Sequence, residues 1–369
     1  MKNLVSFRNK SSLVLIIILF NIQYAAYSQT TFQRILDDTS HGSEIGSSVL
    51  QTNDFGYLIL ADISEFQQTT LLIKTDNIGN VEWANDMGNI VTGSVIQAIN
   101  GGYIIAWGNG LIKTDSLGNV QWRKTYGSGF KSVKQTSDSG YIAVGTGVLI
   151  KTDLNGDTVW TRQYGGGSGI SVDETYDKGF IVTGTSGLGA GDSDIFLSYF
   201  DSSGNIIWSK TYGEWDLDMG SYVEQTLDSG FIITGRTRIS SFTADNDIFL
   251  IKTDDNGNIE WAKTYEMAAC EYWGWVVHQL EDGSYILLGD LACLGSFPKA
   301  ILLNIDSIGN VKWGKYYDSI QVAANNLTLD GGYIITGMNM TSSGYKGIHL
   351  LKTDADRSEE HTSELQSRM

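Results

Sequence analysis

The stretch that decides the fold is Asp254-Asp255-Asn256-Gly257-Asn258-Ile259-Glu260-Trp261, because its pattern occurs six times in the chain. In each copy a glycine follows the aspartate by three residues, and a tryptophan follows it by seven. The copies stand at Asp76/Gly79/Trp83, Asp115/Gly118/Trp122, Asp153/Gly156/Trp160, Asp201/Gly204/Trp208, Asp254/Gly257/Trp261 and Asp306/Gly309/Trp313. A spacing this constant indicates a structural unit that is repeated along the chain.

Each copy has the features of two strands joined by a tight turn. An aspartate side chain caps the backbone of such a turn, and glycine adopts the positive φ that reverses the chain. An apolar run such as 248–253 precedes the turn, and a short run ending in Trp-x-Lys-x-Tyr, as at 208–212, follows it. This order predicts a β-hairpin.

A second predicted hairpin precedes each of these. Its turn and following strand read Asp228-Ser229-Gly230-Phe231-Ile232-Ile233-Thr234-Gly235 in one repeat. Glycine followed by an aromatic residue marks the same place elsewhere, at Gly56-Tyr57, Gly102-Tyr103, Gly140-Tyr141, Gly179-Phe180 and Gly332-Tyr333, with Ser284-Tyr285 in the sixth repeat. Each repeat therefore holds four strands, named a to d here, with short a–b and c–d turns.

The repeat length favours one architecture. The repeated aspartates stand about 38 to 53 residues apart, which fits the four-stranded blade of a β-propeller. The apolar runs are continuous, as expected for a sheet that is covered on both faces by neighbouring blades. We expect the repeated tryptophans to be structural and to pack in the core. They are Trp83, Trp122, Trp160, Trp208, Trp261 and Trp313.

Strands a to c occur seven times, but strand d follows only six of them. The segment 32–36 resembles Trp-x-Lys-x-Tyr and leads into the first a strand, so we expect it to supply the missing d strand and to close the ring. The sequence therefore predicts an all-β protein, a seven-bladed β-propeller of four-stranded antiparallel blades. The alternative is a fragment of an eight-bladed propeller.

Both ends of the chain are predicted to lie outside the propeller domain, which spans residues 29–356. Residues 1–28 have a basic start and the short apolar run 13–20, so they are predicted to be a cleaved signal peptide. That run is shorter than the ~20 residues of a membrane span. The protein is then secreted or displayed at the cell surface. Residues 357–369 resemble a translated sequencing adapter and are predicted to be an artefact.

The charge and the cysteines narrow the expected partners and compartment. The chain has 42 acidic and 25 basic residues, and a formal net charge of −17 disfavours nucleic-acid binding. We expect a monomer whose partner is a protein or a surface polysaccharide. Cys270 and Cys293 lie in connections on the same face of the sixth repeat, and export permits oxidation. The sequence therefore predicts a Cys270–Cys293 disulfide.

The candidate ligand-binding face is the one formed by the d–a and b–c connections, whose lengths vary between repeats. Binding residues are often on variable loops of a rigid scaffold. Two d–a connections combine aromatic rings with carboxylates, which could stack on a sugar and bond its hydroxyl groups. The alternative is that these rings only cover the ends of the blades. The candidates are Trp215, Asp216, Asp218, Glu271, Tyr272 and Trp273.

Paired aspartates on the same face fit calcium, which prefers oxygen ligands. The pairs are Asp192/Asp194, Asp245/Asp247 and Asp216/Asp218. None of them completes the Asp-x-Asp-x-Asp-Gly pattern with a distal glutamate, and an aspartate here could equally cap a loop. Calcium is the one cofactor that the sequence suggests.

The sequence shows no catalytic constellation. Three histidines, His41, His278 and His349, are scattered without metal-ligand spacing, and no nucleophile elbow or phosphate loop occurs. These observations predict an exported, non-catalytic propeller that serves as a binding or interaction scaffold. The alternative is an extracellular polysaccharide-directed enzyme that uses carboxylates such as Asp216, Asp218 or Glu271 as acid and base.

The repeat resembles the blades of quinoprotein-like propellers over the segment 253–261. It is more similar still to secreted bacterial repeat proteins with Asp-Gly-Gly-Tyr-Ile-Ile-Thr-Gly and Lys-Thr-Asp-x-x-Gly-Asn-x-x-Trp units, which stand here at 330–337 and 252–261. The resemblance covers about residues 32–356 and implies a fold rather than an activity. Such proteins often end in a sorting domain for type IX secretion. No quinone-binding residue of the enzymes matches, so the resemblance implies no quinone cofactor.

Overall fold

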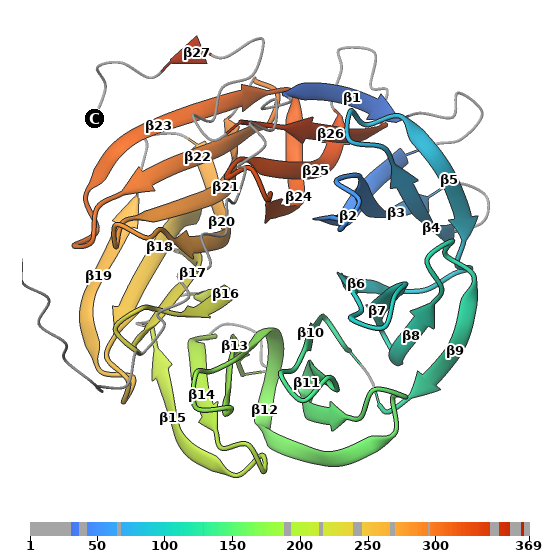
Figure 1. Cartoon of the computed structure of the whole chain (residues 1–369). Coiled ribbons are helices and arrows are strands. Elements are labelled where there is room, and N and C mark those ends of the chain that lie inside the picture. The colour runs from blue at the N-terminus through green and yellow to red at the C-terminus, as the bar shows by residue number, and fades with distance from the viewer. Residues whose placement is uncertain are drawn as a thin grey trace, which may run out of the picture.

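The computed structural model describes residues 31–36, 43–64, 68–127, 129–187, 193–213, 217–238, 246–265, 270–293, 296–339, 347–354 and 363–364. Within these residues every regular element is a β-strand, and all of the pairings between neighbouring strands are antiparallel. The sheets stand around a central opening as a ring (Figure 1). Among the same residues there is no helix with the length and apolar character of a membrane span.

The strands follow the seven predicted repeats, which are called blades 1 to 7 below. Blade 1 contains β2 (Ser43–Gln51), β3 (Tyr57–Ser64), β4 (Gln68–Thr75) and β5 (Val81–Asp86), and blade 2 contains β6 (Thr92–Gln97), β7 (Tyr103–Trp107), β8 (Gly110–Thr114) and β9 (Val120–Thr125). Blade 5 contains β16 (Met219–Gln225), β17 (Phe231–Arg238), β18 (Asn246–Thr253) and β19 (Ile259–Tyr265). Blade 6 contains β20 (Cys270–Gln279), β21 (Tyr285–Cys293), β22 (Lys299–Ile305) and β23 (Val311–Asp318), with the short β27 (Ser363–Glu364) beside β23.

Blades 3 and 4 form one six-stranded sheet. Its strands are β10 (Ser132–Gln135), β11 (Tyr141–Thr152), β12 (Thr158–Glu174), β13 (Phe180–Ser186), β14 (Ile195–Phe200) and β15 (Ile206–Tyr212). The tight b–c turn lies inside β11, and β12 runs on from the d position of blade 3 to the a position of blade 4. The number of blades in the complete protein stays a prediction.

The N-terminal strand closes the ring. Blade 7 contains β24 (Ile320–Leu327), β25 (Tyr333–Asn339), β26 (Ile348–Lys352) and β1 (Phe32–Leu36), which pairs with β26. Phe32 lies opposite Lys352, as Trp83 lies opposite Lys74 in blade 1. The expected closure by a d strand from the start of the chain is therefore confirmed.

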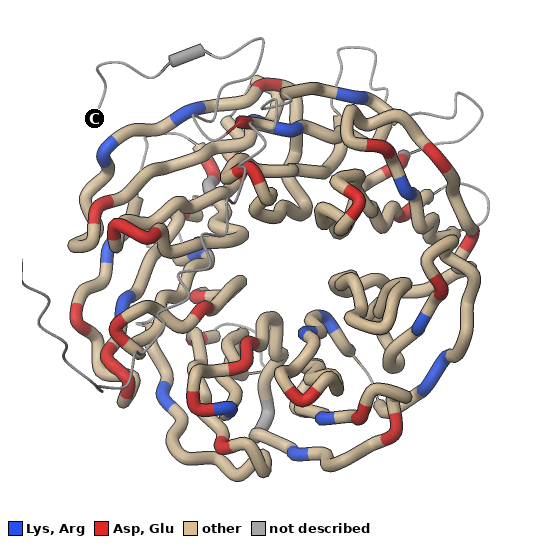
Figure 2. Tube along the Cα trace, viewed as in Figure 1, with Lys and Arg blue, Asp and Glu red and all other residues tan. Residues whose placement is uncertain are grey.

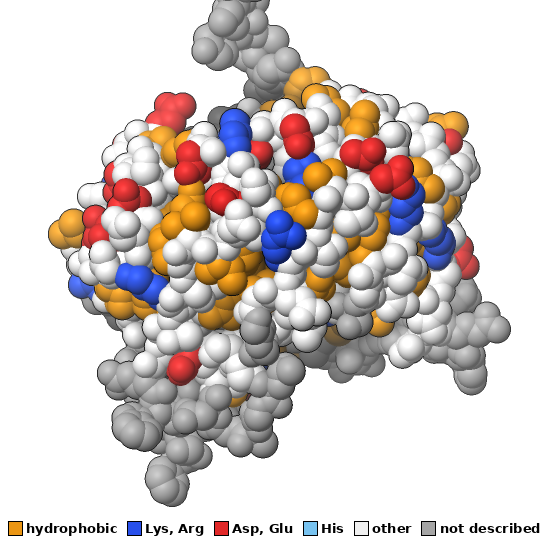
Figure 3. All heavy atoms as spheres, turned by 90° about the horizontal axis from the view of Figure 1, so that it is seen from below, with side chains coloured by type: hydrophobic (Ala, Val, Ile, Leu, Met, Phe, Trp, Pro, Cys, Tyr) orange, Lys and Arg blue, Asp and Glu red, His pale blue; other side chains and the backbone are white. Residues whose placement is uncertain are grey.

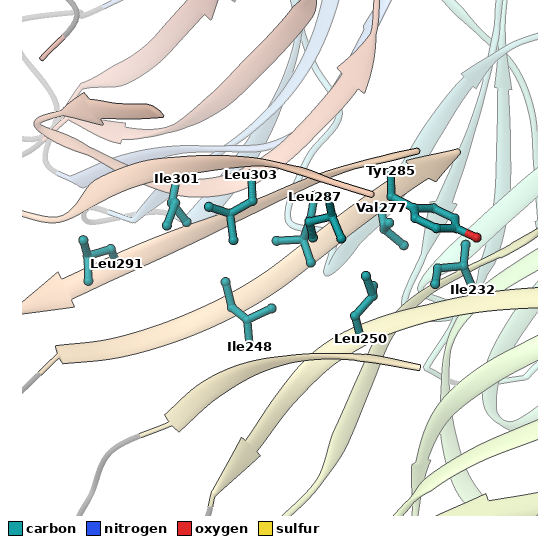
Figure 4. Packing of buried hydrophobic residues seen from close by; sticks show 10 residues of the cluster. Ile232, Ile248, Leu250, Val277, Tyr285, Leu287, Leu291, Ile301 and Leu303 are labelled. Carbon is teal, nitrogen blue, oxygen red and sulfur yellow. The ribbon is translucent and has the colours of Figure 1, made fainter. Parts of the chain in front are cut away.

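The hydrophobic core is divided among the boundaries between blades. The boundary of blades 5 and 6 contains Ile232, Ile248, Leu250, Val277, Tyr285, Leu287, Leu291, Ile301 and Leu303 (Figure 4). Because each sheet is covered on both faces, all eight residues of β18 are buried. The outermost strands alternate between exposed and half-buried side chains, and Figure 3 shows hydrophobic side chains among charged ones on the rim.

The repeated turn has the geometry that its sequence predicts. Asp254 accepts hydrogen bonds at Oδ1 from the backbone N–H groups of Asn256 (2.9 Å) and Asn258 (2.7 Å). Its Oδ2 accepts one from the Asn258 side chain at 2.7 Å. Gly257 has a φ of 72°, in the left-handed region that glycine occupies at little cost.

The repeated tryptophans are half-buried and pack against the hydrophobic clusters at the blade boundaries. A Cβ atom added to Gly257 would be 2.9 Å from the ring of Trp208 in the preceding blade. The same contact joins Gly118 to Trp83, Gly156 to Trp122, Gly204 to Trp160 and Gly309 to Trp261, and it joins Gly79 to Phe32 across the closure. The glycine is therefore required both by the turn and by the neighbouring indole ring.

A set of hydrogen bonds on the turn face also links neighbouring blades. A backbone N–H in the a–b turn of one blade donates to the side chain that ends the a strand of the next blade. The pairs are Asn53 to Gln97, Ile99 to Gln135, Ser137 to Glu174, Tyr176 to Gln225, Leu227 to Gln279 and Leu329 to Gln51. At the corresponding place in blade 7 stands Leu327, whose side chain has no acceptor.

Two glycine substitutions separate the turn from the indole contact. Gly257→Ala should lower the free energy of unfolding by roughly 3–4 kcal/mol, since it adds a clash with Trp208 to the cost of the left-handed backbone. Gly283→Ala is the control, because Gly283 has a φ of 78° and no atom within 4 Å of the added Cβ. It should cost only about 1–2 kcal/mol. Equal losses in urea unfolding would show that the indole contact contributes nothing.

Candidate functional site

The structure describes some of the predicted binding residues and not others. Asp218, Glu271 and Trp273 lie at the ends of strands on the face that carries the b–c and d–a connections. Tyr272 is part of β20, and only its backbone is described. Trp215, Asp216, Asp192 and Asp245 lie outside the described residues.

Asp194 and Asp218, which belong to two different predicted calcium pairs, lie close together at the boundary of blades 4 and 5. A Cβ atom added to Gly213 would be 2.4 Å from Oδ1 of Asp194 and 2.7 Å from Oδ2 of Asp218, so the two carboxylates are neighbours. The backbone N–H of Asp218 donates to the carbonyl of Ser193 at 2.7 Å, and Asp218 is buried. It therefore lies beneath the surface that we expect to meet a ligand.

Calcium stays a prediction. Asp247 is buried near the start of β18, one strand away from Arg236. In the part of the chain that the structure describes, no three His, Cys, Asp or Glu side chains are grouped as a metal would require. The described residues therefore give the calcium hypothesis one close carboxylate pair, Asp194 and Asp218, and no complete ligand set.

A disulfide fixes the strand that carries most of the predicted site. Cys270 and Cys293 lie directly opposite each other in β20 and β21, with their Cα atoms 4.1 Å apart, and their sulfur atoms are bonded. This is the pairing that the sequence predicts. The cross-link holds the outer ends of these two strands together, three residues before Trp273.

The oxidation state of the two cysteines can be measured directly. Alkylation of the purified protein without reductant should modify neither Cys270 nor Cys293, and intact-mass analysis would detect it. Replacing both by serine should lower the free energy of unfolding by about 3 kcal/mol, as expected for a closed loop of this size. Two alkylated thiols in the unreduced protein would contradict the disulfide.

Beside this disulfide the structure brings together two tryptophans, an arginine and an aspartate. The ring centroids of Trp273 and Trp275 are 5.6 Å apart. The guanidinium carbon of Arg236, from blade 5, lies 4.6 Å from the centroid of Trp273, which is a cation–π distance. The indole N–H of Trp275 donates to Oδ1 of Asp290 at 2.9 Å. These four residues are called the aromatic cluster below.

Asp290 is the buried acid of the aromatic cluster. It lies opposite Trp273 in the pairing of β20 with β21 and is only 6% exposed. Burial raises the pKa of Asp290 to about 7, although the hydrogen bond from Trp275 and the charge of Arg236 act in the opposite direction. Near neutral pH both forms of the Asp290 carboxyl group are therefore present. The protonated form can donate a hydrogen bond, and the ionised form can only accept one.

Sequence analysis found part of this cluster. Trp273 and its neighbour Glu271 were predicted from the mixture of rings and acids in one connection. Asp290 and Arg236 were not predicted, because they lie within two b strands, β21 and β17, that are far from each other in the sequence. One feature of the sequence could have pointed to both residues, since each is a charged residue that follows an apolar run. Asp62 in blade 1 has the same feature.

A pocket of about 250 Å³ lies on the same face at the boundary of blades 1 and 2. Asp62 at the end of β3, residues 68–70 at the start of β4, and the connection 89–92 between the blades line it. None of these residues was predicted as part of a site.

The two described histidines have structural partners. His278 on β20 lies 2.7 Å from Glu224 on β16, measured from Nδ1 to Oε2, which links blades 5 and 6 near the central opening. Burial raises the pKa of Glu224, but its hydrogen bond and charge interaction with His278 lower that pKa below its usual value. His349 is buried beside Gln33, and burial lowers its pKa to about 4. Neither histidine is placed beside a described nucleophile.

Comparison with known proteins identifies the architecture. No protein-family model and no curated protein matches the chain. Among solved structures, the C-terminal WD40 domain of Sif2 is similar with a TM-score of 0.51 and 12% identity, over 83% of this chain and 82% of that one. The fold is a β-propeller.

A second solved structure agrees. The extracellular domain of a protein from B. thetaiotaomicron, described as a hybrid two component system, is similar with a TM-score of 0.52 and 9% identity. The match covers 87% of this chain and 41% of that one, so this propeller spans less than half of the longer structure. At these identities the likeness shows the fold alone.

The raised pKa of Asp290 makes a prediction about stability. The folded-state pKa of about 7 is above the ordinary aspartate pKa of 3.8, so the folded protein holds a proton that the unfolded chain releases between these pH values. Asp290 should therefore reduce stability progressively from about pH 4 to pH 7, by as much as ~4 kcal/mol. Asp290→Asn should match wild type near pH 4 and become relatively more stable as the pH rises. A stability difference that does not change with pH would contradict the raised pKa.

Proposed function

We propose that this propeller is an exported, non-catalytic binding module that holds a surface polysaccharide on its variable-loop face. The observation that supports this most strongly is the aromatic cluster, in which both Arg236 and Trp275 pack against the half-buried Trp273. A ring fixed in this way loses little side-chain entropy when a ligand packs on it. A cluster of tryptophan and arginine is also the composition of residues that dominate binding energies.

The polar groups around the rings favour a sugar over a purely apolar ligand. Asp290 can accept or donate a hydrogen bond near neutral pH, Glu271 lies on the same strand as the rings, and Arg236 supplies donors. A sugar presents an apolar face and a ring of hydroxyl groups, so it would use the rings and the polar groups together. This mixture is typical of small-ligand sites, in which a few polar groups fix the orientation.

Export is part of the same proposal. The predicted signal peptide and the cross-strand disulfide both fit an oxidising compartment. One of the two similar solved structures carries the description of an extracellular domain. Acidic residues also outnumber basic ones around the ring (Figure 2), which fits a soluble protein outside the cell.

A glycan array probed with the purified propeller tests the binding proposal. Trp273→Ala should weaken binding to any retained glycan at least tenfold, because the variant loses the central ring of the cluster. Tyr176→Ala is the matched control, since Tyr176 is 61% exposed in an a–b turn on the opposite face. It should bind like wild type. Absence of any glycan binding, or equal losses for both variants, would reject the polysaccharide as ligand and leave a protein partner for the scaffold.

One observation favours a second candidate function. A carboxyl group with a pKa near 7 is suited to act as a general acid, and Asp290 has Glu271 on the neighbouring strand. The alternative is therefore a polysaccharide hydrolase in which Asp290 donates the proton. Asp290→Asn would abolish the release of reducing sugar from a bound polysaccharide while binding persists. Wild-type protein that binds the polysaccharide without cleaving it would exclude this alternative.

A further inference from the structure

The pocket between blades 1 and 2 is separate from the aromatic cluster. It lies among the ends of β3, β4 and β6, across the central opening from β20 and β21 (Figure 1). Its volume of about 250 Å³ is below the ~300–1,000 Å³ of pockets for drug-sized ligands. A group the size of one side chain would fill it. The inference below concerns this pocket and does not depend on the polysaccharide proposal.

Asp62 is the polar centre of the pocket, and two threonine hydroxyl groups orient its carboxylate. Thr70 Oγ1 donates to Oδ1 at 2.9 Å, and Thr92 Oγ1 donates to Oδ2 at 2.7 Å. Thr70 Oγ1 also lies 3.1 Å from the carbonyl oxygen of Ile90, and Thr92 Oγ1 lies 3.1 Å from the hydroxyl oxygen of Ser47. Each hydroxyl has a single hydrogen atom. Once that hydrogen is directed at Asp62, the hydroxyl can only accept a further hydrogen bond.

Another hydrogen bond from a threonine hydroxyl to an aspartate carboxylate lies beside Asp62. The hydroxyl of Thr69 donates to Oδ1 of Asp86, so its remaining capacity is also that of an acceptor. Among the described residues that line the pocket, the side-chain amides of Gln68 and Asn89 still have donors to offer. No lysine, arginine or histidine is among the described residues that line the pocket.

The wall of the pocket therefore offers acceptors and negative charge. A ligand that suits it brings several donors and a positive charge. A primary ammonium group has three N–H donors, no acceptor and a full positive charge. A carboxylate or phosphate would find no cation to pair with and would be repelled by Asp62.

Apolar side chains complete the site. Ile63 and Ile90 are buried in its wall, and Val91 at its rim is 63% exposed. Such a wall packs against methylene groups, as the stem of a lysine side chain does when its charged head is bound elsewhere. We propose that this pocket binds a primary alkylammonium group, with the ammonium at Asp62, Thr70 and Thr92 and the alkyl stem against Ile63, Ile90 and Val91.

Calorimetric titration of the whole exported chain with n-pentylammonium chloride tests the proposal, and n-pentanol serves as the neutral probe of equal shape. The ammonium should bind and the alcohol should bind at least tenfold more weakly. Asp62→Asn keeps the size of the side chain but removes its charge, so it should weaken ammonium binding at least tenfold. Asp282→Asn changes an exposed carboxyl group in the a–b turn of blade 6, on the opposite face of the ring, and should bind the ammonium like wild type.

A second variant keeps the test decisive if Asp62→Asn fails to fold. Val91→Lys changes an exposed rim residue, and its own ammonium group should compete for Asp62 and weaken binding at least threefold. Val91→Gln, of similar length and without charge, should have little effect. Equal binding of pentanol and pentylammonium, or unchanged binding in both Asp62→Asn and Val91→Lys, would overturn the proposal. So would displacement of the ammonium by millimolar Ca²⁺, because the pocket would then be a metal site.

The same titration identifies the source of the ammonium group. Nα-acetyl-lysine methylamide represents a lysine side chain of a partner protein, and pentylammonium represents a free amine. Tighter binding of the blocked lysine indicates a protein ligand, whereas tighter binding of the free amine indicates a small metabolite. If neither ligand binds with a Kd below about 10 mM at low ionic strength, an affinity within reach of so small a ligand, the proposal fails.

Discussion

The contact on which this ring depends is the packing of one aromatic ring on one glycine in the next blade. Among the described residues it is made at the repeated turns of blades 1 to 6, so each of these blades is positioned by its neighbour. The contact needs a residue without a side chain, and the turn needs a residue with positive φ, and glycine alone satisfies both at little cost. At the closure Phe32 takes the place of the tryptophan on Gly79 and β1 completes the last sheet, so the first and last parts of the propeller share one blade.

The two faces of the ring differ because of this construction. On the turn face, a buried lysine in most blades bonds to the carboxylate of the a–b turn, as Lys352 does with Asp330 at 2.8 Å. Hydrogen bonds from a backbone N–H to a glutamine or glutamate side chain link the blades on the same face, and Leu327 stands at the corresponding place between blades 6 and 7. The opposite face carries connections of varied length, and there the structure places the disulfide, the aromatic cluster and the pocket. A rigid face of this kind lets the other face vary without loss of the fold.

The two candidate sites use the same kind of position in different ways. Asp62 and Asp290 are each the sixth residue of a b strand, β3 in blade 1 and β21 in blade 6. Asp290 is nearly fully buried beside indole rings, which raises its pKa to about 7. Asp62 instead receives two threonine hydroxyl hydrogens. Because the same position has different surroundings in the two blades, equivalent places in a repeated fold can serve different ligands.

The sequence by itself determined the repeat, the strand order within it and the way the ring closes, because turn residues and apolar periodicity act locally and are written into every copy. It also pointed to Trp273 and to the pairing of Cys270 with Cys293. Only the tertiary structure decided that the tryptophans lie at the blade boundaries, that Asp218 is buried, and that Arg236 and Asp290 meet at Trp273. The reason is that these contacts join residues from different strands and blades, and their distances depend on how the sheets are rotated about a common axis, which no local pattern encodes.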